Sequence, residues 1–161
     1  MAKERGFSLV ELLIVVAIIA AIAAIAIPNL LSAIMAAHEA AAVGSMRAYT
    51  GAQQVYSATN GGRYGWMPQL SADGYLDERW NRTVAGSWTG SFAGYAFTDL
   101  IYVAGWGQPF PPGGYWLFAQ PPSGSGRYKY FMTGDGVVRY FEAMPGYSLP
   151  SGVVTGDPIG R

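Results

Sequence analysis

The chain has 161 residues, 51% of them hydrophobic, with ten basic and ten acidic side chains and no cysteine. A net charge of zero excludes a strong overall field that would attract nucleic acid or an anionic surface. The lack of cysteine excludes disulfides, thiol nucleophiles and cysteine-based zinc sites. The length fits a single domain together with a membrane anchor.

A long apolar segment follows a short charged one at the N-terminus. Lys3 and Arg5 come first, and residues 12–37 then carry no charged side chain. The 21 residues from Phe7 to Ile27 would form a helix of about 31 Å, long enough to cross the hydrocarbon layer. The basic residues before it predict a cytoplasmic N-terminus. Because the apolar run exceeds the roughly 7–15 residues of a secretory signal, we predict that it is retained.

Glu11 interrupts this apolar segment. A carboxylate near the centre of a membrane helix costs roughly 2.5–3.5 kcal/mol, and less towards the end of the helix. Two interpretations follow. Glu11 is either a tolerated glutamate near the lipid headgroups or a group that awaits a cation from another subunit.

The sequence G-F-S-L-V-E at residues 6–11, the aliphatic run behind it and Pro28 resemble the class III signal of type IV prepilins and of type II secretion pseudopilins. This resemblance implies that a membrane peptidase cleaves between Gly6 and Phe7 and that Phe7 becomes the N-methylated terminus. It also implies that Glu11, then the fifth residue, neutralises the Phe7 amine of a neighbouring subunit during assembly.

The fold implied by the resemblance is the α+β pilin fold, in which a long N-terminal helix at about residues 7–58 packs on a C-terminal antiparallel sheet of about four strands. The expected organisation is a cleaved leader at 1–6, a transmembrane and filament-core helix at 7–37, an amphipathic continuation at 38–58 and a globular head at 59–161.

Within the helix, apolar residues at spacings of three and four predict one stripe that packs on the head: Ala42, Met46, Tyr49, Ala52 and Tyr56. Pro28 cannot donate a backbone hydrogen bond, so a kink or a local weakening is expected there. A role in filament bending and a harmless kink near the membrane boundary both fit this residue.

The head begins with a connection at about residues 60–90 that shows little periodicity. Short aromatic or β-branched runs bounded by glycine or proline then predict four strands: 95–103, 115–120, 127–133 and 137–143. Gly134-Asp135-Gly136 predicts a hairpin between the last two. The sheet is therefore expected to be antiparallel.

Little in the sequence predicts chemistry. The chain has one histidine, His38, beside the apolar helix, and no glycine-rich phosphate loop in a strand-turn-helix context. We therefore expect no enzyme, no cofactor and no specific nucleic-acid site. A calcium site is conceivable at three acidic residues, although their spacing is also typical of a solvated loop: Asp73, Asp77 and Glu78.

The sequence thus predicts the major structural subunit of a type IV pilus-like filament that serves adhesion, motility or DNA uptake. The alternative is a pseudopilin of a type II secretion system, because the same N-terminus serves both. Expected partners are further copies of the chain in a helical filament, the prepilin peptidase and N-methyltransferase, and an inner-membrane assembly platform with its ATPase. The precursor would span the cytoplasmic membrane once and end in an extracellular pilus.

Overall fold

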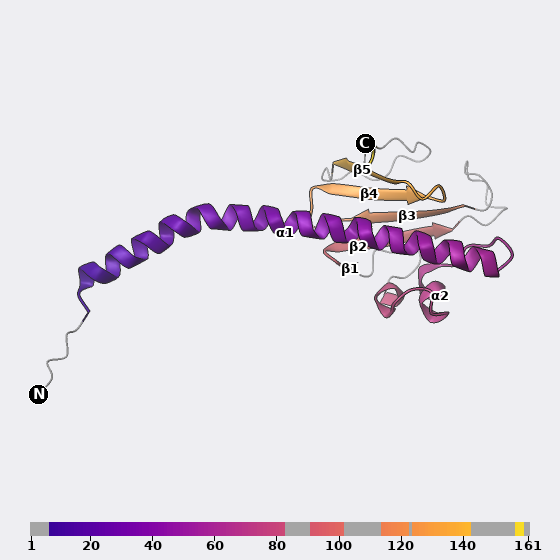
Figure 1. Ribbon diagram of the computed structural model, residues 1–161, viewed down its shortest axis with the longest axis horizontal. Helices are drawn as coiled ribbons and strands as arrows, with labels where there is room; N and C mark the ends of the chain where they lie inside the picture. The colour runs from indigo at the N-terminus through magenta and orange to yellow at the C-terminus, as the bar shows by residue number, and fades with distance from the viewer. Residues whose placement is uncertain (1–6, 83–90, 102–113, 123, 143–156, 160–161) are drawn as a thin grey trace, which may run out of the picture. The chain divides into compact units, whose positions relative to one another are not determined.

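The computed structural model describes residues 7–82, 91–101, 114–122, 124–142 and 157–159 (Figure 1). The helices are α1 (Leu9–Thr59), α2 (Met67–Ala72) and the 3-10 helix η1 (Glu78–Arg82). The strands are β1 (Ser91–Phe92), β2 (Tyr95–Ile101), β3 (Tyr115–Gln120), β4 (Tyr128–Thr133), β5 (Val138–Glu142) and β6 (Asp157–Pro158). By its internal contacts the chain divides into two compact units, residues 1–34 and 35–161.

The described part of the first unit is almost entirely helical. The predicted long N-terminal helix is confirmed as α1, whose buried residues all lie at Glu39 or beyond. Before that point its large aliphatic side chains are exposed; Leu9 is 75% exposed and Ile25 is 70% exposed. An 18-residue window of α1 reaches a mean hydropathy of 3.0 with none of it buried. By length and composition, this part of α1 could cross a membrane.

Pro28 lies inside α1. Proline has no N–H to donate to the carbonyl group four residues earlier, which belongs to Ala24. The Ser32 hydroxyl donates a hydrogen bond to the Pro28 carbonyl oxygen at 3.1 Å. Hydroxyl groups that bond the backbone in this way often accompany bends in helices. The local weakening of the helix at Pro28 stays a prediction.

The second unit contains an antiparallel sheet, as predicted. The six strands found among the described residues follow the order β1-β2-β3-β4-β5-β6, and β1 and β6 have only two residues each. The four longer strands correspond to the four predicted ones. β3 has the predicted bounds, β4 and β5 begin one residue later, and residues 102, 103 and 143 lie outside the described residues.

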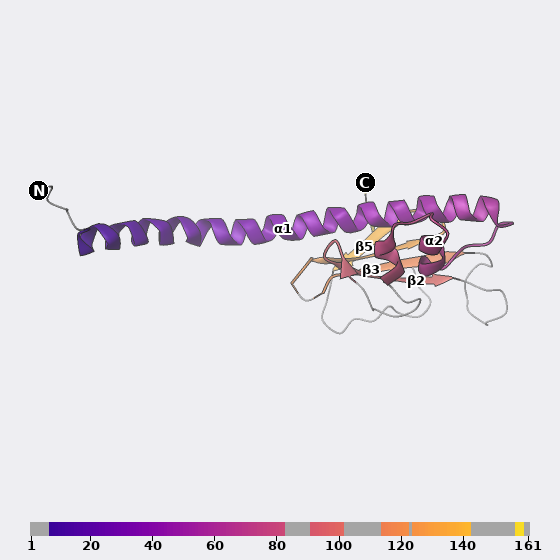
Figure 2. The same cartoon turned by 90° about the horizontal axis from the view of Figure 1, so that it is seen from below.

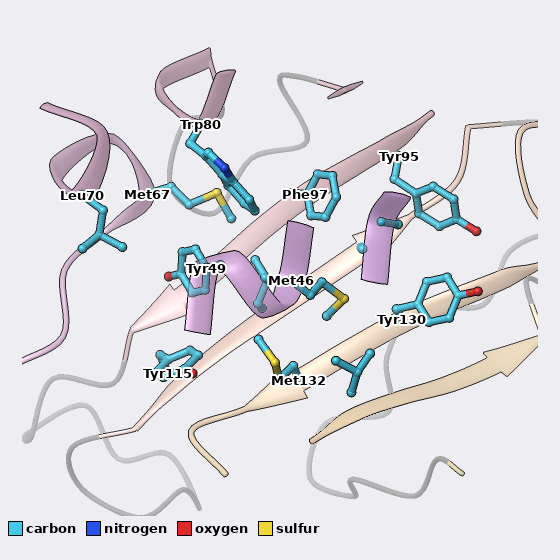
Figure 3. Close-up of a cluster of buried hydrophobic side chains, with 14 of the residues drawn as sticks. Met46, Tyr49, Met67, Leu70, Trp80, Tyr95, Phe97, Tyr115, Tyr130 and Met132 are labelled. Atoms are coloured by element: carbon cyan, nitrogen blue, oxygen red, sulfur yellow. The ribbon is translucent and has the colours of Figure 1, made fainter. Parts of the chain in front are cut away.

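The C-terminal part of α1 lies across one face of this sheet, and the sheet and α2 are on the same side of it (Figure 2). The predicted apolar stripe is buried, with Met46 and Tyr49 wholly inaccessible. They meet side chains from alternate positions of the strands, which share a face because successive strand residues point to opposite sides. Figure 3 shows this core, including Phe97, Tyr115 and Met132.

Part of the connection at residues 60–90 is more regular than the sequence predicts. α2 begins next to Pro68, a residue favoured in the first helical turn because its missing N–H has no partner there in any case. η1 follows and inserts Trp80, which is 2% exposed, against Tyr49 and Phe97 with ring centroids 5.5 and 5.2 Å away. Local periodicity missed both helices because each is at most six residues long.

The predicted hairpin joins β4 to β5 through residues 134–137. Asp135 accepts hydrogen bonds from the Thr133 hydroxyl and the Val137 N–H at 2.7 and 3.0 Å, and its carboxylate lies 2.7 Å from Arg139. Burial alone would raise the pKa of Asp135, but the bonds from Arg139, Thr133 and Val137 outweigh burial and lower it to about 2. Gly136 adopts a φ of 72°, which suits glycine.

A buried carboxylate links α1, α2 and β2. One oxygen of Asp99 accepts hydrogen bonds from the Met67 N–H at 2.6 Å and from the Tyr49 hydroxyl at 3.2 Å. Gln53 extends this network by donating to Tyr49 and to the Gly65 carbonyl group. The second Asp99 oxygen has no hydrogen-bond partner within the part of the chain that the structure describes. Burial therefore raises the pKa of Asp99 despite the bonds from Met67 and Tyr49.

Replacing Asp99 with asparagine should stabilise the head at neutral pH. A raised folded-state pKa means that the contribution of Asp99 to stability is present below the unfolded value of about 3.9 and is lost as the pH rises through the folded value. Asparagine keeps the acceptor for Met67 and Tyr49 and removes the charge. We expect a gain of about 1 kcal/mol at pH 7, or roughly 2–4 °C in Tm, that disappears near pH 3.

Near-ultraviolet circular dichroism of the full chain in detergent measures this difference. Asp77→Asn is the control, because Asp77 is exposed and pairs only with Arg79 at the surface; it should change stability by less than about 1 kcal/mol. An equal shift for Asp99→Asn at both pH values would contradict the assignment.

Candidate functional site

The first turn of α1 is organised by Ser8 and Glu11. Ser8 precedes the first helical residue, so it occupies the N-cap position, and Glu11 occupies the third helical position. The Ser8 backbone N–H donates to a Glu11 carboxylate oxygen at 2.9 Å, and the Leu12 N–H donates to the Ser8 carbonyl oxygen at 3.2 Å. This is the glutamate half of a capping box. The S-x-x-E spacing carries that signal in the sequence, but our sequence interpretation did not use it.

The cap holds the Glu11 side chain back towards the start of the helix. Helix N-termini carry a partial positive charge, so a carboxylate there is favoured by roughly 0.3–1 kcal/mol. The recorded bond uses one carboxylate oxygen, Oε2. Glu11 forms no ion pair with any other residue that the structure describes.

Phe7 lies directly before this cap and is 77% exposed. Gly6, the residue on the other side of the predicted cleavage bond, lies outside the described residues. Phe7 and Glu11 are four residues apart in the same chain, and the structure places the Glu11 carboxylate against the Ser8 backbone, one residue after Phe7.

The remaining surface of this segment is aliphatic. Large apolar side chains from Leu9 to Ile34 are exposed all around the helix. An exposed apolar surface of this size marks an interaction surface in water. Lipid chains cover such a surface in a membrane, and other helices can replace the lipid, since alanine-rich segments permit close packing.

The acidic residues proposed for calcium are not gathered into a site. Asp77 pairs with Arg79 at 2.6 Å. The hydrogen bond from the Arg79 side chain lowers the pKa of Asp77, and its effect outweighs that of burial, which would raise the pKa. Among the described residues, no group of three or more histidine, aspartate or glutamate side chains could hold a metal ion. Asp73 and Glu78 form no ion pair within those residues.

A second charged contact, which the sequence did not predict, lies near the start of the second unit. Glu39 is 8% exposed and accepts a hydrogen bond from the Arg127 backbone N–H at 2.9 Å, and its carboxylate lies 3.3 Å from the Arg127 guanidinium. His38 Nδ1 lies 3.2 Å from the Ser125 carbonyl oxygen. These contacts join α1 to the loop between β3 and β4, and they give His38 a structural environment.

Comparison with known proteins identifies the N-terminal segment. Residues 1–27 match the family described as the prokaryotic N-terminal methylation motif. This motif is the class III signal peptide of type IV pilins and pseudopilins, and the helix and sheet that follow it form the α+β pilin fold. The match covers the N-terminal segment only. The motif supports a type IV pilin-like or pseudopilin subunit in general, and the apolar helix behind it fits a membrane-anchored precursor. No curated protein matches the chain.

Proposed function

We propose that this chain is the major structural subunit of a type IV pilus-like extracellular filament. The observation that carries the proposal is the methylation motif at residues 1–27. Most of this motif lies in α1, whose large aliphatic side chains from Leu9 to Ile34 are exposed. Such a helix suits two environments, a bilayer before assembly and a bundle of identical helices after it. The head, built on the sheet, would form the outer wall of the filament.

In this proposal the leader and the helix act in sequence. Lys3 and Arg5 hold the N-terminus on the cytoplasmic side. The peptidase cuts between Gly6 and Phe7, where glycine leaves the backbone open to close approach. Cleavage removes the leader charges and creates a cationic amine on Phe7, and methylation preserves that charge.

Glu11 would then select the incoming subunit. The charged carboxylate is costly in lipid, and the amine of a neighbouring Phe7 carries the opposite charge. Pairing the two in a low-dielectric surrounding offsets the desolvation of both groups. The helix can therefore leave the bilayer when a growing filament offers the matching amine, and the assembly platform with its ATPase would supply the displacement.

The proposal is tested on filaments sheared from cells that produce the chain. We expect long fibres composed of this subunit, and mass spectrometry of their N-terminal peptide should find a chain that begins at Phe7 with one added methyl group. Short periplasmic assemblies that appear only together with protein secretion would instead identify a pseudopilin. A chain that begins at Met1 or at a site after Phe7 would contradict the proposed processing.

A further inference from the structure

The side of α1 that faces away from the sheet has an unusual composition for an exposed surface. We call it the outer face of α1 and define it as the exposed residues between positions 36 and 58. Of these 11 residues, six are alanine and two are glycine; the other three are Arg47, Gln54 and Val55. The sheet, α2 and η1 all lie on the opposite side of this part of the helix (Figure 2). A helix face in contact with water normally carries many charged and polar residues.

Packing within this chain does not explain why the outer face has two glycines. A Cβ atom built at Gly44 or at Gly51 meets nothing within 4 Å. Each glycine in a helix interior is about 1 kcal/mol less favourable than alanine. Small residues in a row allow the backbone of another element to approach closely, which indicates that the element covering this face comes from another molecule.

Arg47 is the only charged residue on the outer face. It forms no ion pair or side-chain hydrogen bond with the described residues. Three other arginines do so: Arg79 with Asp77, Arg127 with Glu39 and Arg139 with Asp135. An arginine enclosed in an apolar contact requires a carboxylate, because a charge buried without a partner is strongly destabilising. The element that covers the outer face should therefore be acidic.

The molecule itself carries acidic residues of the required kind. Among the described exposed carboxylates, those without an ion pair are Glu11, Asp73 and Glu78. Glu11 belongs to the capped first turn of α1. Asp73 follows the last residue of α2 and Glu78 is the first residue of η1, so they are the two ends of the short segment 73–78. This segment lies beyond the β1 edge of the sheet (Figure 1). We call this segment the acidic loop.

We propose that the outer face of α1 binds the acidic loop of a second copy of the chain, with Arg47 facing Asp73 and Glu78. The two surfaces are different patches of one molecule, so the contact is heterologous and each subunit retains one free patch of each kind. Such a contact propagates from subunit to subunit. In the proposed filament this contact would join the heads of neighbouring subunits. Only its continuation into a helix of subunits rests on the proposed function.

Cross-linking of the full chain in cell membranes and in sheared filaments tests the contact. Because the chain has no cysteine, the double variant Ala48→Cys, Ala72→Cys places single thiols beside Arg47 and beside Asp73 and keeps every charge. A short bismaleimide should produce a ladder of dimers, trimers and larger species. Each single-cysteine variant should remain monomeric.

Charge reversal then identifies the residues. Adding Arg47→Glu should reduce the ladder at least about tenfold, since a like-charge contact costs more than the 1.4 kcal/mol that corresponds to this factor. Arg63→Glu is the matched control, because Arg63 is exposed and unpaired among the described residues but lies after α1; it should leave the ladder unchanged. Adding Asp73→Lys and Glu78→Lys to Arg47→Glu should restore it.

Each other outcome overturns the inference. No ladder, a ladder that Arg47→Glu leaves intact, or a failure of the double lysine variant to restore it would exclude the contact. Dimers from Ala48→Cys alone would show that two outer faces meet each other instead. Filaments without a ladder would contradict only this inference, whereas a ladder in membranes of cells that make no filament would contradict only the proposed function.

Discussion

Glu11→Gln is expected to abolish filament assembly and to leave cleavage of the leader intact. Glutamine also suits the third position of a capping box, so it can accept the Ser8 N–H bond that Glu11 accepts at 2.9 Å. The start of the helix should therefore be preserved while the charge is lost. Without that charge a neighbouring Phe7 amine would enter the apolar filament core without a partner, which is strongly unfavourable.

The measurement compares the amount of sheared filament with the amount of mature subunit left in the membrane. We expect filaments to fall at least about tenfold, which corresponds to only 1.4 kcal/mol. Glu11→Ala should fail equally and should also lose the hydrogen bond from the Ser8 N–H, which contributes about 0.5–1.5 kcal/mol to the first turn. If Glu11→Gln assembles normally and Glu11→Ala does not, Glu11 acts through the helix cap and not through its charge.

Ser8→Ala separates the two roles further. The donor to Glu11 is the Ser8 backbone N–H, which alanine retains, so this variant should assemble at close to the native level. A loss of filaments in Ser8→Ala as large as that in Glu11→Gln would point to the serine hydroxyl as a further requirement of assembly.

Gly6→Leu is expected to retain the leader. A leucine side chain next to the Gly6–Phe7 bond would hinder the close approach that a peptidase needs, whereas glycine presents only backbone. The uncleaved chain keeps an uncharged amide at Phe7 and keeps Lys3 and Arg5 in front of the apolar helix. No cation would then be available for Glu11, and the leader charges would have to enter the filament core, so filaments should be absent.

Mass spectrometry of the membrane-extracted protein measures leader retention directly. Ala2→Leu is the matched control, because it adds the same side chain to the leader away from the proposed bond; it should be processed normally. Gly6→Leu protein that begins at Phe7 and assembles into fibres would show that the cleavage site lies elsewhere.

Local patterns in the sequence were sufficient for most of the secondary structure. α1 was predicted at about 7–58 and is found at Leu9–Thr59, and β3 has its predicted bounds. The helix was predicted from its apolar run and from the apolar stripe that follows it, and the strand from a short aromatic run bounded by glycine and proline; neighbouring residues carry these signals by themselves. The methylation motif is local in the same way, because a peptidase must recognise it in a short stretch of chain.

Contacts between distant residues could not be predicted in this way. Glu39 accepts a hydrogen bond from Arg127, which is 88 positions away in the sequence, and Asp99 accepts one from the Met67 N–H, which is 32 positions away. No local pattern marks such a pair, since each partner is chosen by the way the helix lies on the sheet. The short helix α2 could not be predicted from local patterns either. A helix of six residues has marginal stability alone and forms through its packing in the head.

The sequence by itself therefore determined that this protein has an apolar helix, a processing motif and an antiparallel head, because each is encoded in adjacent residues. The tertiary structure decided which carboxylates are already used and which remain unpaired. Glu39, Asp77 and Asp135 have arginine partners within the chain, whereas Glu11 is held only by a backbone N–H. The physical reason is that these ion pairs depend on how α1, the sheet and the loops pack together, which local sequence patterns do not specify.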